Sequence, residues 1–530
     1  MTKRTITLAI IGGGSVATSF LAQLAQAIDL GKNSPITHVK IFDPTPKPGA
    51  GNAYQDDCIS NLLNTRVVGM SALQSDPAHF YNWALNNEKR CSDLFRSVKI
   101  TADAFVPRTI FGLYLNDVYQ NAVSALQHRG VVIEHIKSMA TSLREHCGRY
   151  EITTQTQQKM FSNLVVLSAG NLESIQFDHL RPSDKYFATP YPCKALGAAI
   201  PSDSCVGILG SSLSAIDAAI SLVEAGHKGK ILMISRNGRL PSVRGEHNLN
   251  RKPKLLSREN VDALAKRQGG QIRLVEIAQL LKTEIETHCD MQIDWADVLR
   301  QHEGPQRYID NEIQEASIGD RVWQAVVYGL NDAIDLIWHY LPDGDRKVFD
   351  REFKSRWLSY RVSFPIENAK KLQTLLHTNQ LSVYGGFNEA NFDDSLGMFA
   401  INVSQGTPGF SASLHTNYLI NATGYTSIVS QSRSPLFRNL IANGQATVHP
   451  FGGINAEFET SRVVSKSGHV HEDLYALGSM VSGTYFWTNA MNVNCRLAKG
   501  IVEQIINRAN DLSSIVEPAR SNTTTELEHA

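Results

Sequence analysis

Two stretches of the chain combine a short apolar run, a glycine-rich turn and a helix-like spacing of apolar residues. In the first, the run 6–11 leads into Gly12-Gly13-Gly14-Ser15-Val16-Ala17, and a second run, 38–42, ends at Asp43. This order predicts the βαβ unit that binds dinucleotides, with the pyrophosphate at the helix N-terminus and the ribose at the acid. We therefore expect an α/β protein whose first dinucleotide site lies at the start of the chain.

Several later segments favour FAD at this first site. Residues 48–54 (PGAGNAY) form another glycine-rich turn, where backbone can approach a flavin or its diphosphate. A polar stretch follows at 62–65, and the segment 105–108 leads into a helix. The runs 163–170 and 474–478 end in glycine, as closing strands of such a domain do. The expected FAD contacts are Gly12, Gly14, Ser15, Val16, Asp43, Gly51, Asn52, Asn64, Arg108, Gly170 and Gly478.

The second strand-turn-helix pattern lacks its middle glycine. The run 204–209 leads into Gly210-Ser211-Ser212-Leu213, and the Cβ of Ser212 would hold a pyrophosphate slightly further away. The following strand, 230–234, ends in Ser235-Arg236 instead of an acid, and this pair can bind the 2′-phosphate of NADPH. A solvated charge at a strand end is the alternative for Arg236. The expected NADPH contacts are Gly210, Ser211, Ser212, Leu213, Ser235, Arg236 and Gly424.

Composition argues against several other classes of protein. Lys plus Arg and Asp plus Glu both number 51, so no net charge attracts nucleic acid or an anionic membrane. No stretch approaches the roughly 18 apolar residues of a membrane span. Seven scattered cysteines without a C-x-x-C pair argue against disulfides, a zinc site and dithiol exchange. His469 and His471, in an expected solvated hairpin, lack a third ligand, so we expect no metal and a cytoplasmic protein.

The middle of the chain exceeds what a nucleotide domain requires. Apolar and aromatic residues recur at helical spacing over 323–341 and 353–360, and Pro365 is typical of a helix start. We interpret residues 245–380 as a helical insertion that caps the second nucleotide domain. Arg356 and Arg361 flank aromatic residues and could bind an anionic substrate, although a structural ion pair is the simpler interpretation.

These segments predict how the 530 residues divide into domains. The expected fold is α/β, with two Rossmann-like dinucleotide-binding domains, the second inserted in the first, and a helical insertion. The FAD-binding domain would comprise residues 1–195 and 426–510. The NAD(P)H-binding domain would comprise residues 196–425, with the insertion at about 245–380. The polar residues 511–530 would form a disordered tail.

The order of the motifs resembles that of two-dinucleotide flavoproteins. Residues 210–219 (GSSLSAIDAA), 235–241 (SRNGRLP) and 105–108 (FVPR) are similar to motifs of bacterial FAD/NAD(P)-binding proteins. The chain is also similar to FAD-dependent urate hydroxylases and, more distantly, to N-hydroxylating monooxygenases. Those last enzymes carry D-x-x-x-[LF]-A-T-G-Y, whereas Asn417 and Asn421 stand at its first and fifth places here. This departure weakens the inference that this chain, like those enzymes, acts on an amino acid.

The resemblance implies an NADPH-using, FAD-dependent monooxygenase. Such an enzyme oxygenates a small polar or nitrogen-containing substrate with O₂ through a flavin C4a-hydroperoxide, and the cofactor carries the difficult chemistry. No catalytic side chain is implied, and the oligomeric state is left open. Two alternatives are an NAD(P)H-dependent flavin reductase or dehydrogenase and a flavin or nucleotide sensor without turnover, which Ser212 favours.

Overall fold

The computed structural model describes residues 5–28, 35–94, 99–245, 252–289, 292, 304–319, 321–404 and 411–514. Its first domain is built on a sheet with the strand order β16-β17-β7-β1-β2-β3. All neighbouring strands are parallel except β16, which is an antiparallel edge strand. The strands are β1 (Ile6–Ile11), β2 (Ile36–Phe42), β3 (Val132–Ile136), β7 (Leu164–Leu167), β16 (Arg462–Val464) and β17 (Val470–Ala476).

Helices cover one face of this first sheet, and a small antiparallel sheet covers the other. Apolar side chains of α1 and the C-terminal α18 share one core with β1 and β2. The opposite face buries a second core against β4, β5 and α16. The helices are α1 (Ser15–Ala27), α2 (His79–Asn86), α3 (Glu88–Leu94), α4 (Arg108–His128), α16 (Pro435–Ala442), α17 (Ser482–Tyr485) and α18 (Met491–Ser514), with short 3₁₀ turns η1 (Val67–Gly69), η5 (Val429–Gln431) and η6 (Ser479–Val481). The small sheet comprises β4 (Ala140–His146), β5 (Arg149–Thr154) and β6 (Lys159–Ser162).

The second domain repeats this plan with a parallel sheet of order β11-β10-β9-β15-β8. Its strands are β8 (Tyr186–Phe187), β9 (Val206–Leu209), β10 (Ile231–Ile234), β11 (Leu381–Tyr384) and β15 (Tyr418–Asn421). One face packs on α5 (Lys194–Ala199), α6 (Leu213–Glu224), α10 (Pro305–Ile318) and α15 (Ile366–His377), and the other on β12 (Phe387–Asp393), β13 (Met398–Ser404) and β14 (Ser411–Thr416), with η2 (Asp178–Leu180) nearby. After β7 the chain builds the second sheet and returns to the first sheet only at β16, so the second domain is inserted in the first. The expected α/β fold class is confirmed.

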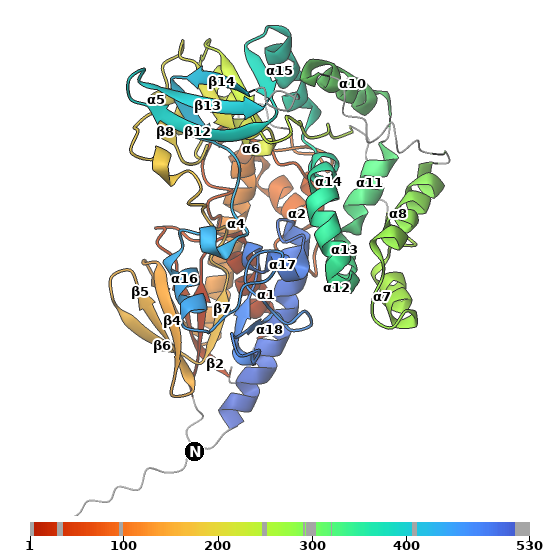
Figure 1. Cartoon of the computed structure of the whole chain (residues 1–530). Helices are drawn as coiled ribbons and strands as arrows, with labels where there is room; N and C mark the ends of the chain where they lie inside the picture. Colours follow the sequence, from red (N-terminus) through yellow and green to blue (C-terminus); the bar gives the residue numbers. More distant parts are fainter. Residues whose placement is uncertain are drawn as a thin grey trace, which may run out of the picture.

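The regular elements among the insertion's described residues are all helices or helical turns, joined by loops. Figure 1 shows its helices standing along one side of both domains. Trp338 Nε1 donates to Gly483 O at 2.7 Å, so the insertion also contacts α17 of the first domain. It therefore covers the junction between the domains as well as the second domain. Its elements are α7 (Arg258–Arg267), α8 (Leu274–Cys289), α10, α11 (Val322–Gly329), η3 (Leu330–Asp332), α12 (Ile334–Tyr340), α13 (Asp343–Val348), the π-helical turn η4 (Phe349–Phe353), α14 (Lys354–Arg361) and α15.

Three local expectations differ from the structure. The strand β8 belongs to the second sheet although it precedes residue 196. The helix α18 continues to Ser514, so residues 511–514 are helical where a disordered tail was expected; residues 515–530 lie outside the described part. The solvated hairpin at 469–471 is wrong for His471, which is 4% exposed because β17 is an inner strand. Its Nε2 lies 2.8 Å from Gln445 O.

Two further observations bear on the classes of protein considered above. Within the part of the chain that the structure describes, no helix is both long and apolar enough to cross a bilayer. All seven cysteines are free thiols.

Candidate functional site

The first glycine loop is fixed by backbone contacts that require glycine. Gly12 has φ +105°, and a Cβ there would lie 2.3 Å from Ser168 O at the end of β7. The Gly13 N–H donates to Asp43 Oδ2 at 2.6 Å, and the Thr45 N–H donates to Asp43 Oδ1 at 2.8 Å. Thr45 Oγ1 also donates to Oδ1, so Asp43 holds the loop itself, and Oδ2 keeps a lone pair for a ribose hydroxyl.

The second glycine turn docks directly on this loop. The Gly49 N–H donates to Gly13 O at 2.7 Å, and Thr18 Oγ1 donates to Gly49 O at 2.9 Å. Gly51 has φ +65°, and a Cβ there would approach the Cα of Gly14 to 3.0 Å. Gly14 is the N-cap of α1 and supplies no side-chain cap, so the N–H groups of the first helical turn are open to a phosphate.

Glycines at the ends of two other strands complete the surroundings of the first loop. A Cβ on Gly478, after β17, would contact the side chain of Val16 at 3.7 Å. Gly170, after β7, accepts a hydrogen bond from Ser479 Oγ at 2.7 Å. Asn52 is exposed within the second glycine turn. Asp43, the turn at Gly51, Gly170 and Gly478 thus surround the first loop from four segments of the chain.

Arg108, expected at the FAD site from its motif, pairs with residues of the second domain. Its guanidinium forms a buried ion pair with Asp217 on α6 at 2.7 Å, and it donates to Tyr191 Oη at 2.9 Å. Burial lowers the pKa of Arg108, but the Asp217 carboxylate, Tyr191 and Tyr54 together outweigh it, so the net shift is upward. The pair joins α4 of the first domain to α6 of the second.

The second glycine loop has the same turn at its first glycine, but serines occupy its middle positions. Gly210 has φ +120°, and a Cβ there would lie 2.6 Å from Ala422 O at the end of β15. Ser212 is the N-cap of α6 and makes no side-chain cap, so its helix N-terminus is open. Ser211 Oγ donates to Arg239 O at 2.6 Å and lies 2.9 Å from Ser235 Oγ. The hydroxyls of Ser211 and Ser235 therefore shape the turn.

Three arginines gather beyond the carboxyl end of β10. Arg236 is exposed, and Asn237 Nδ2 donates to Ser355 Oγ at 2.9 Å, which holds the neighbouring Arg356 close to this strand end. Burial and the charge of Arg356 lower the pKa of Arg239. Among the described residues, Arg236, Arg239 and Arg356 have no carboxylate partner. This cluster of positive charge suits a phosphate.

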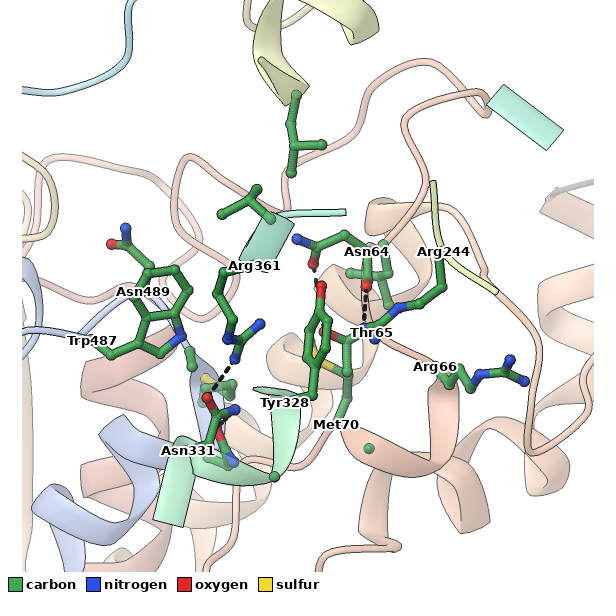
Figure 2. A pocket seen from close by; sticks show the side chains of 18 of the residues that line it. Asn64, Thr65, Arg66, Met70, Arg244, Tyr328, Asn331, Arg361, Trp487 and Asn489 are labelled. Atoms are coloured by element: carbon green, nitrogen blue, oxygen red, sulfur yellow. Dashed lines mark hydrogen bonds between the residues drawn. The ribbon is translucent and has the colours of Figure 1, made fainter. Parts of the chain in front are cut away.

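A cavity of about 500 Å³ lies where both domains and the insertion meet (Figure 2). Tyr54, from the second glycine turn, and Leu213, from the second loop, both line it. The insertion contributes Tyr328 and Arg361, and the segment before α18 contributes Trp487. Its further lining residues are Ala53, Leu63, Asn64, Thr65, Arg66, Gly69, Met70, Arg108, Arg244, Lys252, Gly329, Asn331, Asp332, Leu358, Val362, Asn489, Ala490, Met491 and Asn492.

A stack of two arginines and a tyrosine forms one wall of this cavity. The guanidinium carbons of Arg244 and Arg361 lie 3.4 and 3.8 Å from the centroid of the Tyr328 ring. Two groups cannot share one face at these distances, so one covers each face, as Figure 2 shows. Arg361 also lies 4.8 Å from the ring of Trp487.

The backbone beside Trp487 adopts a rare conformation. Phe486 has φ +59° and ψ −58°, and the Trp487 N–H donates to Tyr485 O at 2.6 Å. This is a γ-turn of the uncommon, strained form, and such outliers gather at functional sites. The turn aims Trp487 at the cavity.

The cavity contains residues that the sequence motifs did not indicate. Asn64, Arg108 and Leu213 were expected at cofactor sites, and Arg361 was considered as a substrate contact. Arg244, Tyr328 and Trp487 were not singled out for such a role. Arg244 follows the Leu240-Pro241 end of a recognised motif, which is the one available signal for it.

Comparison with known proteins supports the assignment of the N-terminal domain. Residues 9–172 match the model of a family described as FAD-NAD(P)-binding. The chain is 21% identical over 416 residues to the uncharacterized protein YdhS of Escherichia coli (strain K12), covering 69% of this chain and 74% of YdhS.

Solved structures with the same fold include flavin-dependent enzymes. DfoA of Erwinia amylovora, a cadaverine monooxygenase solved with FAD, is 14% identical with a TM-score of 0.56, covering 99% of this chain and 100% of DfoA. The ornithine N-hydroxylase KtzI of Kutzneria sp. 744, solved with reduced FAD, NADP⁺ and L-ornithine, is 13% identical with a TM-score of 0.54, covering 96% and 100%. At these identities the likeness shows the fold.

Proposed function

We propose that the protein is an FAD- and NADPH-dependent monooxygenase of a small polar or nitrogen-containing molecule. One observation carries this proposal: a single cavity is lined by Tyr54, three residues after Gly51, and by Leu213, directly after Ser212. Cofactors bound at the two loops could therefore bring their reactive ends together in one cavity.

The residues of the first loop fit FAD. The touching backbones of Gly14 and Gly51 and the open N-terminus of α1 form a cradle that a side chain would fill. When bound, FAD would supply electron transfer and the activation of O₂, which no side chain can perform. The chain itself would bind the diphosphate at Gly14 and Ser15, orient the ribose at Asp43 and enclose the flavin with Tyr54 and Trp487.

The second loop fits NADPH in preference to NADH. Arg236, Arg239 and Arg356 offer guanidinium groups that no described carboxylate neutralises, where a 2′-phosphate would lie. The Ser235 hydroxyl accepts the Gly238 N–H at 3.0 Å, whereas Arg236 is exposed and has no ion-pair partner among the described residues, so Arg236 is the member of the expected pair more available to the phosphate. Arg108 and Asp217 would keep the two loops in register across the domain boundary.

The similar structures support the reaction class. KtzI is an ornithine N-hydroxylase and DfoA a cadaverine monooxygenase, and both share this chain's fold over nearly its whole length. The resemblance to urate hydroxylases rests on motifs alone and stays a prediction. So does the amine substrate, because Asn417 and Asn421 depart from the motif of the N-hydroxylating enzymes.

Isotope labelling tests the reaction class. The purified protein would be supplied with NADPH and ¹⁸O₂ in the presence of candidate amines and organic acids. We expect one ¹⁸O atom in an oxygenated product and NADPH consumption that depends on O₂. Reduction of another acceptor without oxygen, and no labelled product, would instead establish a reductase. A flavin spectrum that NADPH never changes would establish a sensor.

A further inference from the structure

The Arg244–Tyr328–Arg361 stack carries positive charge that the described residues leave unneutralised. Arg244 and Arg361 are only 4% and 3% exposed. Arg244 donates to Asn64 O at 3.1 Å, and Arg361 donates to Asn331 Oδ1, so both partners are uncharged. The Nε atoms of both arginines are buried without a hydrogen-bond partner. Burying a charge in this way is costly unless a counter-ion completes the site.

We propose that the cavity binds a carboxylate of its substrate at Arg244 and Arg361, so that the enzyme acts on an organic acid. That the bound carboxylate belongs to a substrate rests on the proposed function, whereas the anion site itself would exist without turnover. The planar guanidinium fork matches a carboxylate, which it binds through two parallel hydrogen bonds.

The other charged residues of the cavity do not neutralise this pair. Arg66 pairs with Asp103 at 2.9 Å, and Arg108 pairs with Asp217. Lys252 and Asp332 are exposed, so water screens both charges. The excess of buried positive charge is therefore concentrated on Arg244 and Arg361.

Tyr328 offsets the positive charge of the two arginines only in part. Its ring faces attract both guanidinium groups, but a neutral phenol carries no net charge. The Ser363 N–H donates to Tyr328 Oη at 3.3 Å, and Ser363 Oγ lies 2.9 Å away. Burial raises the pKa of Tyr328, yet the charges of Arg244 and Arg361 and the hydrogen bonds with Ser363 together outweigh it and lower the pKa. Burial lowers the pKa of Arg361 to about 10, which leaves it charged at neutral pH.

A buried polar network holds the backbone around Arg244. The Val243 N–H donates to Glu312 Oε2 at 2.7 Å, and Gln324 Nε2 donates to Val243 O at 2.7 Å. The Gly245 N–H donates to Gln324 Oε1 at 3.1 Å. Glu312 is itself paired with Arg321 at 2.6 Å, so its carboxylate is not the counter-ion of Arg244. This rigid support is what a preorganised anion site requires.

Calorimetric titration of the protein as isolated tests the proposal. Acetate and benzoate are the carboxylate probes, and inorganic phosphate and NADP⁺ are titrated separately. We expect the carboxylates to bind, and Arg244→Gln or Arg361→Gln to weaken them roughly ten- to a hundredfold, since each removes a charged hydrogen-bond donor. Arg361→Lys, which keeps the charge and loses the fork, should weaken them less. Arg236→Gln is the matched control: it should weaken NADP⁺ and leave carboxylate binding unchanged.

Three results would overturn the proposal. The first is no carboxylate binding to a wild-type protein that melts cooperatively. The second is a loss of phosphate, NADP⁺ or flavin binding in Arg244→Gln and Arg361→Gln, because the arginines would then serve a cofactor. The third concerns Glu246, which lies outside the described residues two positions after Arg244. If Glu246→Gln strengthened carboxylate binding, the chain itself would supply the counter-ion. Flavin content and NADPH bleaching are recorded in parallel, so failure of the proposed function is seen separately.

Discussion

The two glycine loops have the same turn at their first glycine but differ in their middle residues and in the groups around them. In the first, the turns at Gly14 and Gly51 touch and Asp43 holds Gly13, so backbone closes the site before any ligand binds. In the second, Ser212 replaces the middle glycine, and three arginines without described carboxylate partners stand at the strand end. The first loop is thus suited to a cofactor that stays bound, and the second to a charged one that exchanges. The predictions below test this contrast.

The largest effect is expected at Gly12. Gly12→Ala places a Cβ 2.3 Å from Ser168 O at φ +105°, so the strand end must move, which should lower the free energy of unfolding by roughly 4 kcal/mol and abolish flavin binding. Urea unfolding and flavin content measure this. Gly130→Ala, between α4 and β3, is the matched control, because its φ is +80° with no atom within 4 Å, so only the backbone strain of about 1 kcal/mol should remain. Equal losses at both positions would contradict the close approach.

The next largest effect is expected from breaking the ion pair between α4 and α6. Arg108→Leu leaves the Asp217 carboxylate buried without its cation and should cost about 3 kcal/mol of unfolding free energy. The double variant Arg108→Leu/Asp217→Leu should recover most of that loss. Denaturant titration of both variants checks this, and a double variant no more stable than the single would show that neither residue depends on the other.

A smaller effect is expected at Arg236. Arg236→Gln removes a charged donor for the 2′-phosphate and should raise the Kd for NADPH roughly tenfold, leaving the Kd for NADH and the flavin content unchanged. Equilibrium binding of the two nucleotides distinguishes these outcomes. An equal weakening of NADH would show that Arg236 acts elsewhere on the nucleotide.

The smallest effect is expected at Ser212. Ser212→Gly makes the second loop resemble the first and lets the pyrophosphate approach more closely, so NADPH should bind about two- to threefold more tightly. The same titration measures it. Since glycine also loosens the helix start, a cost of a few tenths of a kcal/mol in stability should accompany the gain.

The sequence predicted those features whose causes are local. Gly12, Gly14 and Asp43 lie within one strand-turn-helix-strand unit, so their placement follows from neighbouring residues. Arg108 was recognised by motif, but its partner Asp217 comes from another domain. The burial of His471 depends on β16 pairing beside β17, which no local pattern reveals.

The cavity was the least predictable part of the molecule. Arg244, Tyr328 and Trp487 lie far apart in the sequence, and no spacing relates them. Their meeting depends on the insertion contacting both domains, through bonds such as that from Trp338 to Gly483. The positive charge of the cavity follows from which arginines lack carboxylates, and that requires the packed structure.

Anaerobic mixing with NADPH tests most directly whether both loops serve one cavity. The purified protein should be yellow, and a stopped-flow absorbance trace should show the oxidised flavin bleached by NADPH faster than by NADH, with the colour returning when O₂ is admitted. A yellow protein whose spectrum stays unchanged at saturating NADPH, with NADPH binding demonstrated separately, would contradict the account.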